Sequence, residues 1–230
     1  MKRGWREFIH LVQNGTRAQQ NALISQMPLR LAASARNTTH LTSRHVRELR
    51  LNKLFLDSLG SNTRVLEVGP GTGRLADWLL RHSELDERNY EMLDLAYGIN
   101  PPYLKKRVFL LKQRRPNQAR RGNVFTEILP KEKYDHILLP RSFTPQTHPK
   151  YSEILGENQS EPEAYSRVMK ELLLKLAPSL KIQGSIRISY VDDSTAEEMA
   201  RDPAFKDFSK IISGAPSGTD LILEKNKHKN

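Results

Sequence analysis

The chain of 230 residues contains no cysteine. Without thiols it has no disulfide framework, no thiolate zinc site and no cysteine nucleophile. It also lacks any apolar run near the roughly 20 residues that a membrane-spanning helix needs. Its seven histidines show none of the spacings typical of metal ligands, so we predict no metal site.

Acidic residues are scarce in two stretches. Residues 1–47 hold eight Lys and Arg against one acid, and residues 105–121 hold eight against none. Because the whole chain carries a formal charge of +11, the remaining residues sum to −4. Such patches attract polyanions or steer anionic substrates, although ordinary exposed faces are the alternative. We predict nucleic acid or another polyanion as a partner through these two patches.

The first basic stretch also has the Arg-rich, Ser-containing and acid-poor character of an organellar transit peptide. Against that, residues 42–59 have the pattern of a helix, with an N-cap at Thr42 or Ser43 and an end at Gly60. We therefore expect a cytoplasmic protein in which residues 1–60 form a basic helical cap. Mitochondrial targeting by the N-terminal segment is the alternative.

The most informative stretch is residues 64–80. An apolar strand at 65–68 is followed by three glycines at alternate positions and then by a helical pattern from residue 74. Glycines allow a tight turn and a close approach of the backbone to a ligand. The N-terminus of the following helix presents unpaired N–H groups and a positive dipole to that loop. This arrangement predicts a nucleoside or carboxylate site.

The spacing of the glycines narrows the ligand. A dinucleotide fingerprint needs its third glycine three residues after the second, whereas Gly73 comes one step early, and the Lys-Ser/Thr of a P-loop is absent. What remains is Glu67 followed by Gly69, Gly71 and Gly73. This pattern resembles the first motif of the class I S-adenosylmethionine-dependent methyltransferases. The resemblance covers about residues 61–224.

Later segments fit the same fold in order. Apolar runs predict strands at 90–95, 108–111, 134–139 and 185–190, helices at 164–176 and from 195, and a hairpin joining 210–212 to 221–223. Strands that alternate with helices imply a mostly parallel sheet covered on both faces. With the resemblance, this implies an α/β three-layer sandwich whose mostly parallel seven-stranded sheet ends in an antiparallel hairpin. We expect a helical cap at 1–60, a methyltransferase-like domain at 61–224 and a disordered tail at 225–230.

The resemblance assigns S-adenosylmethionine as cofactor, together with residues that hold it. It implies that Glu67 holds the amino group of the cofactor. Its methionine part would lie over the turn made by Gly69, Pro70, Gly71 and Gly73. Asp94 follows Gly73 by 21 residues and would accept both ribose hydroxyls, with Glu91 as its rival.

Two further segments complete the implied site. Asn123 and Val124 occupy the position where the family often contacts the adenine amine with an Asp; an amide oxygen accepts that bond without charge. Arg141 and Phe143 follow the fourth strand, where the family places residues that face both methyl donor and acceptor. An ordinary loop is the alternative for this last pair. The loop residue His148 could act as a base near the acceptor or be purely structural.

The resemblance implies a methyltransferase whose acceptor the sequence does not identify, with RNA or another anionic molecule favoured by the basic patches. The alternative is a non-catalytic, methyltransferase-like module for basic binding or assembly. No catalytic residue is assigned, because a sulfonium is already an activated donor and alignment alone supplies much of the rate. A base is needed only if the acceptor must first lose a proton.

Overall fold

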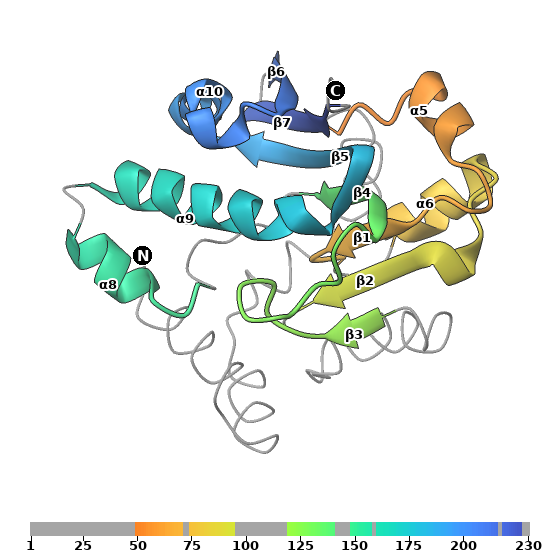
Figure 1. Cartoon of the computed structure of the whole chain (residues 1–230), viewed down its shortest axis with the longest axis horizontal. Coiled ribbons are helices and arrows are strands. Elements are labelled where there is room, and N and C mark those ends of the chain that lie inside the picture. The colour runs from red at the N-terminus through yellow and green to blue at the C-terminus, as the bar shows by residue number, and fades with distance from the viewer. Residues whose placement is uncertain are drawn as a thin grey trace, which may run out of the picture.

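The computed structural model of the chain describes residues 49–70, 74–94, 119–140, 148–157, 160–215 and 218–226 (Figure 1). Its described strands form one seven-stranded sheet in the order β3-β2-β1-β4-β5-β7-β6. The strands are β1 (Val65–Val68), β2 (Tyr90–Asp94), β3 (Ala119–Arg121), β4 (Tyr134–Leu139), β5 (Leu180–Val191), β6 (Phe208–Ala215) and β7 (Gly218–Lys225). The α-helices are α5 (Lys53–Ser58), α6 (Arg74–His82), α8 (Tyr151–Glu157), α9 (Glu161–Leu176) and α10 (Asp193–Arg201).

The directions of the strands confirm the predicted fold class. β1 pairs in parallel with β2 on one side and with β4 on the other. β2 is parallel to β3, and β4 is parallel to β5. β7 alone among them runs antiparallel, inserted between β5 and β6, and the β6–β7 hairpin joins the segments that the sequence predicts. The sheet is thus mostly parallel and ends in an antiparallel hairpin.

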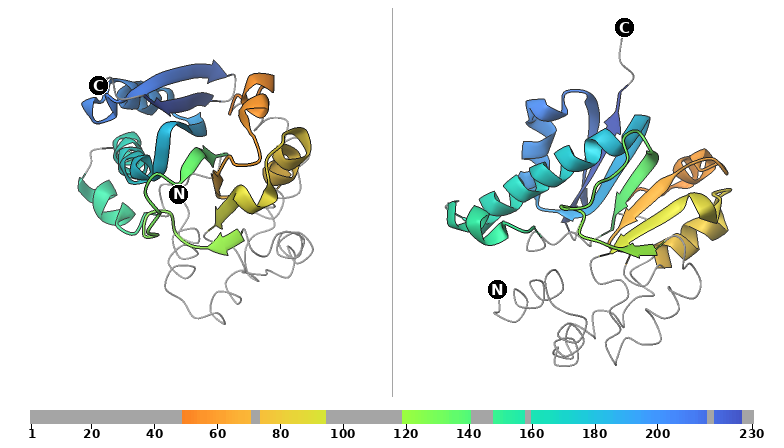
Figure 2. Two further views of the ribbon diagram at one scale, coloured as in Figure 1. Left: turned by 45° about the vertical axis from the view of Figure 1, so that its right-hand side comes forward. Right: turned by 60° about the horizontal axis from the view of Figure 1, so that its bottom comes forward.

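Side chains alternate between the two faces of this sheet, so each strand contributes to two cores. On one face, residues such as Leu66, Ile137 and Ile186 pack with apolar positions of α9 and α10. On the other face, Val65 and Tyr90 pack with α5 and α6. Figure 2 shows the three layers, with α8, α9 and α10 on one side of the sheet and α5 and α6 on the other.

The boundaries of α9 follow from local chemistry. Ser160 accepts a hydrogen bond from the backbone N–H of Glu163, whose carboxylate accepts one from the N–H of Ser160 in return. This capping box satisfies two backbone donors that a helix start would otherwise leave without partners. The helix ends at Leu176 and passes into a 3₁₀ turn that contains Pro178, as the sequence predicts.

Of the helix predicted over residues 42–59, the described part is helical only in α5 (Lys53–Ser58), and residues 49–52 are not helical. Leu49 and Arg50 form a turn, with Arg50 at a φ of 49°, and α5 begins only after its N-cap, Asn52. The cause is a tertiary contact: Nη1 of Arg187 donates to the carbonyls of Leu49 at 3.0 Å and Arg50 at 3.1 Å. These carbonyls therefore bond to a buried side chain on β5 instead of to helical N–H groups.

Two further predictions concern the strand beside β2 and the C-terminal tail. The strand beside β2 is Ala119–Arg121, whereas the predicted strand at 108–111 lies outside the described residues. Lys225 belongs to β7 and not to a disordered tail, because it pairs with Phe208 and its Nζ donates to the carbonyl of Leu180 at 2.9 Å. The division of the chain into cap, domain and tail otherwise stays a prediction.

Among the described residues, no helix is both long enough and apolar enough to cross a lipid bilayer.

Replacing Arg187 by Met should lower the free energy of unfolding by about 2–4 kcal/mol, because the carbonyls of Leu49 and Arg50 lose their charged donor. Urea denaturation would measure this. Arg201→Met is the matched control, since Arg201 is exposed and pairs with Glu197 one helical turn away; its effect should stay below about 0.5 kcal/mol. Equal effects of the two substitutions would contradict a structural role for the Arg187 contacts.

Candidate functional site

The carboxyl ends of β1, β2 and β3 are joined by backbone hydrogen bonds. The N–H of Gly69, just past β1, donates to the carbonyl of Leu93 at 2.7 Å. The N–H of Gly122, just past β3, donates to the carbonyl of Asp94 at 3.1 Å. Ligands of open α/β sheets bind beyond this edge of the sheet, near the point where strand order reverses. In this sheet the reversal lies at β1, between β2 and β4.

Gly69 makes the turn that leads from β1 toward α6. Its φ of 71° lies in the left-handed region, where a residue with a Cβ is strained. Pro70 follows it and is buried. Gly71 and Gly73, the other glycines of the predicted turn, lie outside the described residues. The backbone geometry at Gly69 nevertheless explains why glycine stands at the first position of the motif.

Glu67 is buried in the middle of the sheet, with 1% of its surface exposed. It lies on the α6 side, because it follows Val65 by two residues along β1. The hydroxyl of Tyr90 donates to its Oε2 at 2.8 Å. One oxygen of Glu67 is therefore held by β2, and the role implied for this residue, holding the amino group of the cofactor, stays a prediction.

Asp94 extends the same face. Tyr90 and Met92 both belong to the core on the α6 side, and Asp94 continues this alternation along β2. Burial raises the pKa of Glu67 to about 7; the Tyr90 hydrogen bond opposes the shift, and the charges of Asp94 and Asp77 add to it. The carboxylates of Asp94 and Asp77 thus lie close enough to Glu67 to disfavour its ionised form. Among the described residues, no group of acids and histidines is arranged to hold a metal ion.

Glu91, the rival of Asp94, is separated from this cluster. It accepts a hydrogen bond at 2.8 Å from the hydroxyl of Tyr134, whose ring belongs to the core on the α9 side. Lys133 also forms an ion pair with Glu91. The two acids of β2 therefore lie on opposite faces of the sheet, and Asp94 is the one that shares a face with Glu67.

Asn123 and Val124 lie just past β3, next to Asp94. Both are buried, at 9% and 8% exposure. The Oδ1 of Asn123 accepts the backbone N–H of Phe125 at 3.1 Å, which holds the segment in a tight turn. Arg141 and Phe143, the predicted acceptor-side residues, lie outside the described residues.

His148 is not arranged as a base toward an acceptor. Its Nδ1 accepts the backbone N–H of Lys150 at 3.1 Å, and its Nε2 lies 2.9 Å from the carboxylate of Glu171. Its ring also meets the edge of Phe125, with centroids 4.7 Å apart. Both ring nitrogens are therefore engaged within the protein, so His148 links the segments that follow β3 and β4.

Sequence reasoning missed Tyr90 and Asp77 as parts of this site. Tyr90 stands four residues before Asp94, so the period of two along a strand places both on one face, and this signal was available. Asp77 is on α6, and its effect on Glu67 depends on how α6 packs across β1 and β2. No periodicity in the sequence gives that distance.

No protein-family model matches the chain, and no curated protein matches its sequence. Solved structures do match. One contains the Haloferax volcanii Trm112 methyltransferase activator and a protein described as a methyltransferase, with 14% identity, coverage of 86% of this chain and 96% of that chain, and a TM-score of 0.51. Another is the S-adenosylmethionine-dependent methyltransferase SibL in its apo form, with 16% identity, coverage of 96% and 70%, and a TM-score of 0.50.

The order of the seven strands and the two matched structures indicate the same fold. The chain has the fold of the class I S-adenosylmethionine-dependent methyltransferases. At these identities the likeness concerns the methyltransferase fold alone. The roles of the residues at its carboxyl edge rest on the geometry of this chain.

The raised pKa of Glu67 predicts a pH-dependent stability. The folded state holds the Glu67 proton up to about pH 7, whereas the unfolded chain releases it near 4.5. The folded state therefore binds more protons between these values, and stability falls as pH rises through that window, by about 3 kcal/mol. Glu67→Gln should remove this loss, so the variant should gain on the wild type between pH 5 and pH 8.

Urea denaturation at several pH values would measure the difference between the two proteins. The difference is needed because burial lowers the pKa of His136 to about 4, which makes stability rise with pH over an overlapping range. That contribution is the same in both proteins and cancels. Parallel curves for wild type and Glu67→Gln would show that Glu67 is ionised throughout the window.

Proposed function

We propose that this chain is an S-adenosylmethionine-dependent methyltransferase. The observation that carries the proposal is the juxtaposition of Glu67 and Asp94 on one face, beside the left-handed turn at Gly69. The matched solved structures include S-adenosylmethionine-dependent enzymes, which supports this ligand for a chain of the same fold.

The charge of the site suits a cationic nucleoside. Mutual repulsion and burial destabilise the ionised form of Glu67, so a positive group close by is favoured there. S-adenosylmethionine carries an ammonium and a sulfonium group. In the proposal, the other oxygen of Glu67 faces the ammonium, Asp94 accepts from the ribose hydroxyls, and Asn123 accepts from the adenine amine. Pro70, Gly71 and Gly73 continue the turn beneath the methionine part, and Val124 lines the adenine side.

When bound, this cofactor supplies an activated methyl group. The task left to the chain is to align the acceptor in line with that methyl and to keep water away, which contributes about 7–11 kcal/mol in favourable cases. Arg141 and Phe143 follow Pro140 at the carboxyl end of β4 and are the proposed contacts to the acceptor. His148 has no place in the proposed chemistry, because its two ring nitrogens are engaged.

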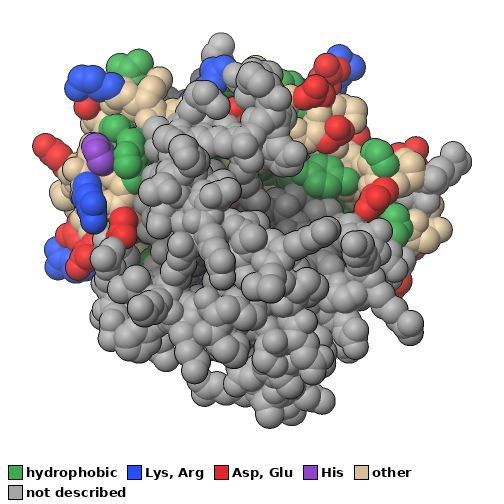
Figure 3. Space-filling model, turned by 180° about the vertical axis from the view of Figure 1, so that it is seen from behind, with side chains coloured by type: hydrophobic (Ala, Val, Ile, Leu, Met, Phe, Trp, Pro, Cys, Tyr) green, Lys and Arg blue, Asp and Glu red, His purple; other side chains and the backbone are tan. Residues whose placement is uncertain are grey.

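The distribution of charge favours an anionic acceptor such as RNA. The described residues hold 20 Lys and Arg against 24 Asp and Glu, a formal charge of −4, so the other residues of the chain carry +15. On the face drawn in Figure 3, acids and bases among the described side chains are interspersed. The basic stretch from residue 105 belongs to the connection between β2 and β3, and β2 ends at Asp94 of the proposed cofactor site. Arg120, at the end of that stretch, pairs with Glu127.

A non-catalytic module that uses the same fold is the second candidate. One observation favours it: the side-chain oxygen of Asn123 already closes a local turn, so this position has a structural role without any ligand. Such a module would bind a polyanion but would neither bind the cofactor nor transfer a methyl group.

Asp94→Asn should weaken binding of S-adenosylmethionine about 10–100-fold, because the carboxylate bonds to two hydroxyls become bonds to a neutral amide. Isothermal titration calorimetry would measure the dissociation constants. Glu91→Gln is the matched control on the same strand and should bind within about twofold of wild type. A larger loss for Glu91→Gln than for Asp94→Asn would assign the ribose to the other acid, and no binding at millimolar cofactor would overturn the proposal.

Incubation with radiolabelled S-adenosylmethionine and fractionated cell extract should label the RNA fraction more than protein, lipid or small molecules.

Changing Lys105, Lys106 and Arg107 together to Gln should weaken RNA binding and reduce its dependence on salt, because fewer phosphates are neutralised. The control changes the exposed Lys53, Arg201 and Lys206 to Gln, which alters net charge equally. RNA binding without label in any fraction would favour the non-catalytic module.

A further inference from the structure

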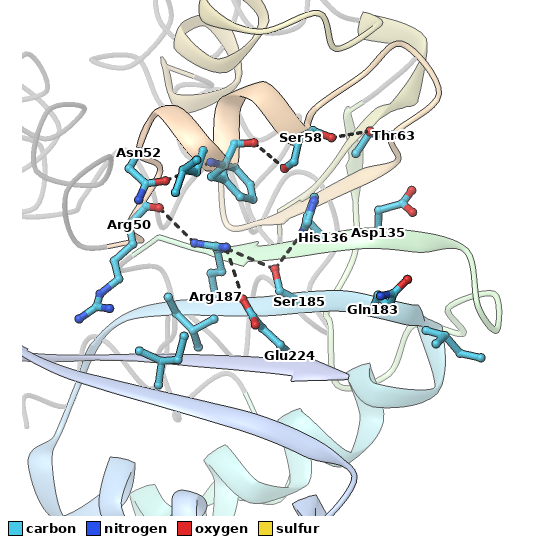
Figure 4. Close-up of a pocket in the computed structure, with 15 residues that line it drawn as sticks. Arg50, Asn52, Ser58, Thr63, Asp135, His136, Gln183, Ser185, Arg187 and Glu224 are labelled. Atoms are coloured by element: carbon cyan, nitrogen blue, oxygen red, sulfur yellow. Dashed lines mark hydrogen bonds and ion pairs between the residues drawn. The ribbon is translucent and has the colours of Figure 1, made fainter. Parts of the chain in front are cut away.

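A cavity lies away from the carboxyl edge of the sheet, on which the proposed cofactor site is placed. It has a volume of about 580 Å³ and lies between α5 and the face of the sheet formed by β4, β5, β6 and β7 (Figure 4). Its polar floor includes His136, Ser185 and Arg187. His136 is paired with Val65 at the start of β1, four residues before Gly69, so this floor is displaced by about 13 Å along the strands from the proposed cofactor turn.

The hydrogen bonds of Arg187 leave part of its guanidinium facing the cavity. Nε donates to the hydroxyl of Ser185 at 3.2 Å, and Nη1 donates to two main-chain carbonyls at 3.0 and 3.1 Å. Nη2 has no hydrogen-bond acceptor among the described residues; the nearest carboxylate oxygen, on Glu224, lies 3.9 Å away. Arg187 lines the cavity and is 9% exposed, so an acceptor bound there would meet Nη2 with little competing bulk water.

The charges around Nη2 favour an anion. The side chain of Arg50 also lines the cavity and forms no ion pair within the described part of the chain, and its charge acts on Arg187. Glu224 is 44% exposed and too distant from Nη2 for a hydrogen bond. The charge of Asp135 is compensated by Lys181, whose Nζ donates to its carboxylate at 2.8 Å. The same carboxylate also accepts from the backbone N–H of Arg64 at 2.7 Å. One cationic charge is therefore left uncompensated beside the cavity floor.

The walls and rim of the cavity are apolar. The ring of Phe55 lies 4.2 Å from the guanidinium of Arg187, and Ile222 and Ile211 extend the wall along β7 and β6. At the rim, Leu54 is 79% exposed and Ile182 is 48% exposed. Large aliphatic side chains exposed beside a polar pocket are typical of a binding site. A ligand that fits has an anionic head at Arg187 and an apolar body between Leu54 and Ile182.

We propose that this cavity is a second ligand site, independent of the proposed methyltransferase activity, for a small organic carboxylate with an apolar tail. A carboxylate oxygen can accept a charge-assisted hydrogen bond from Nη2, and the side chain of Arg50 adds a second positive charge to the cavity lining. The cavity volume lies within the usual range of about 300–1,000 Å³ for small-molecule sites. Glu224 competes for the same guanidinium, so this residue tunes the affinity of the site.

Octanoate is the probe for this site, with 1-octanol and butanoate as comparisons that lack the charge or the tail. Titration calorimetry on the full chain should show octanoate binding at least tenfold more tightly than either. Arg50→Gln should weaken octanoate binding about tenfold, whereas Glu224→Gln should strengthen it about threefold. Ile182→Ser should weaken the binding of octanoate but not of butanoate. Ile128→Ser, at a residue 93% exposed and outside the cavity lining, is the control and should change neither.

Each variant is first checked by thermal unfolding, and Arg187 itself is left intact because its substitution is expected to destabilise the fold. Equal affinity for octanoate and 1-octanol, or wild-type affinity in both Arg50→Gln and Glu224→Gln, would overturn the proposal. The variant Asp94→Asn should bind octanoate with wild-type affinity, although its affinity for S-adenosylmethionine is expected to fall about 10–100-fold. Failure of this site and failure of the cofactor site are thereby distinguished.

Discussion

The parallel pairing of β1 with β2 on one side and with β4 on the other determines where the chemical groups of this protein lie. β1 lies between β2 and β4. At its carboxyl end the chain turns out of the sheet through Gly69, which has a left-handed backbone conformation. The register of β1 with β2 then places Glu67 and Asp94 on one face. A shift of one residue would move one acid to the α9 side and separate the pair.

The buried carboxylate of Glu67 is costly to ionise, and in the proposed function a bound cationic ligand would offset that cost. Burial penalises its charge, and the neighbouring acids add to the penalty. The Tyr90 hydroxyl offsets part of it without supplying a positive charge. A cationic ligand would supply that charge. The same electrostatic imbalance therefore underlies both the expected pH-dependent stability and the proposed preference for a positively charged nucleoside.

Much of this architecture could be predicted from the sequence. The apolar runs of β1 and β4 and the helical period over residues 164–176 matched the observed elements closely, because packing against the sheet and local capping act in the same direction. The hairpin of β6 and β7 was equally clear. The start of α5 could not be predicted, because Arg187, more than 130 residues away, bonds to the carbonyls of the turn before it. α8 and the strand at Ala119–Arg121 were also missed, since each is short.

The sequence by itself determined most of the elements, the glycine turn and the separation of positive charge from an acidic remainder, since these depend on residue type and short-range spacing. Only the tertiary structure decided which acid of β2 shares a face with Glu67, that Tyr90 holds this carboxylate, and that Arg187 lies beneath an open cavity. Each of these depends on contacts between segments distant in the chain. Such contacts arise from strand register and helix packing, which no local pattern of residues encodes.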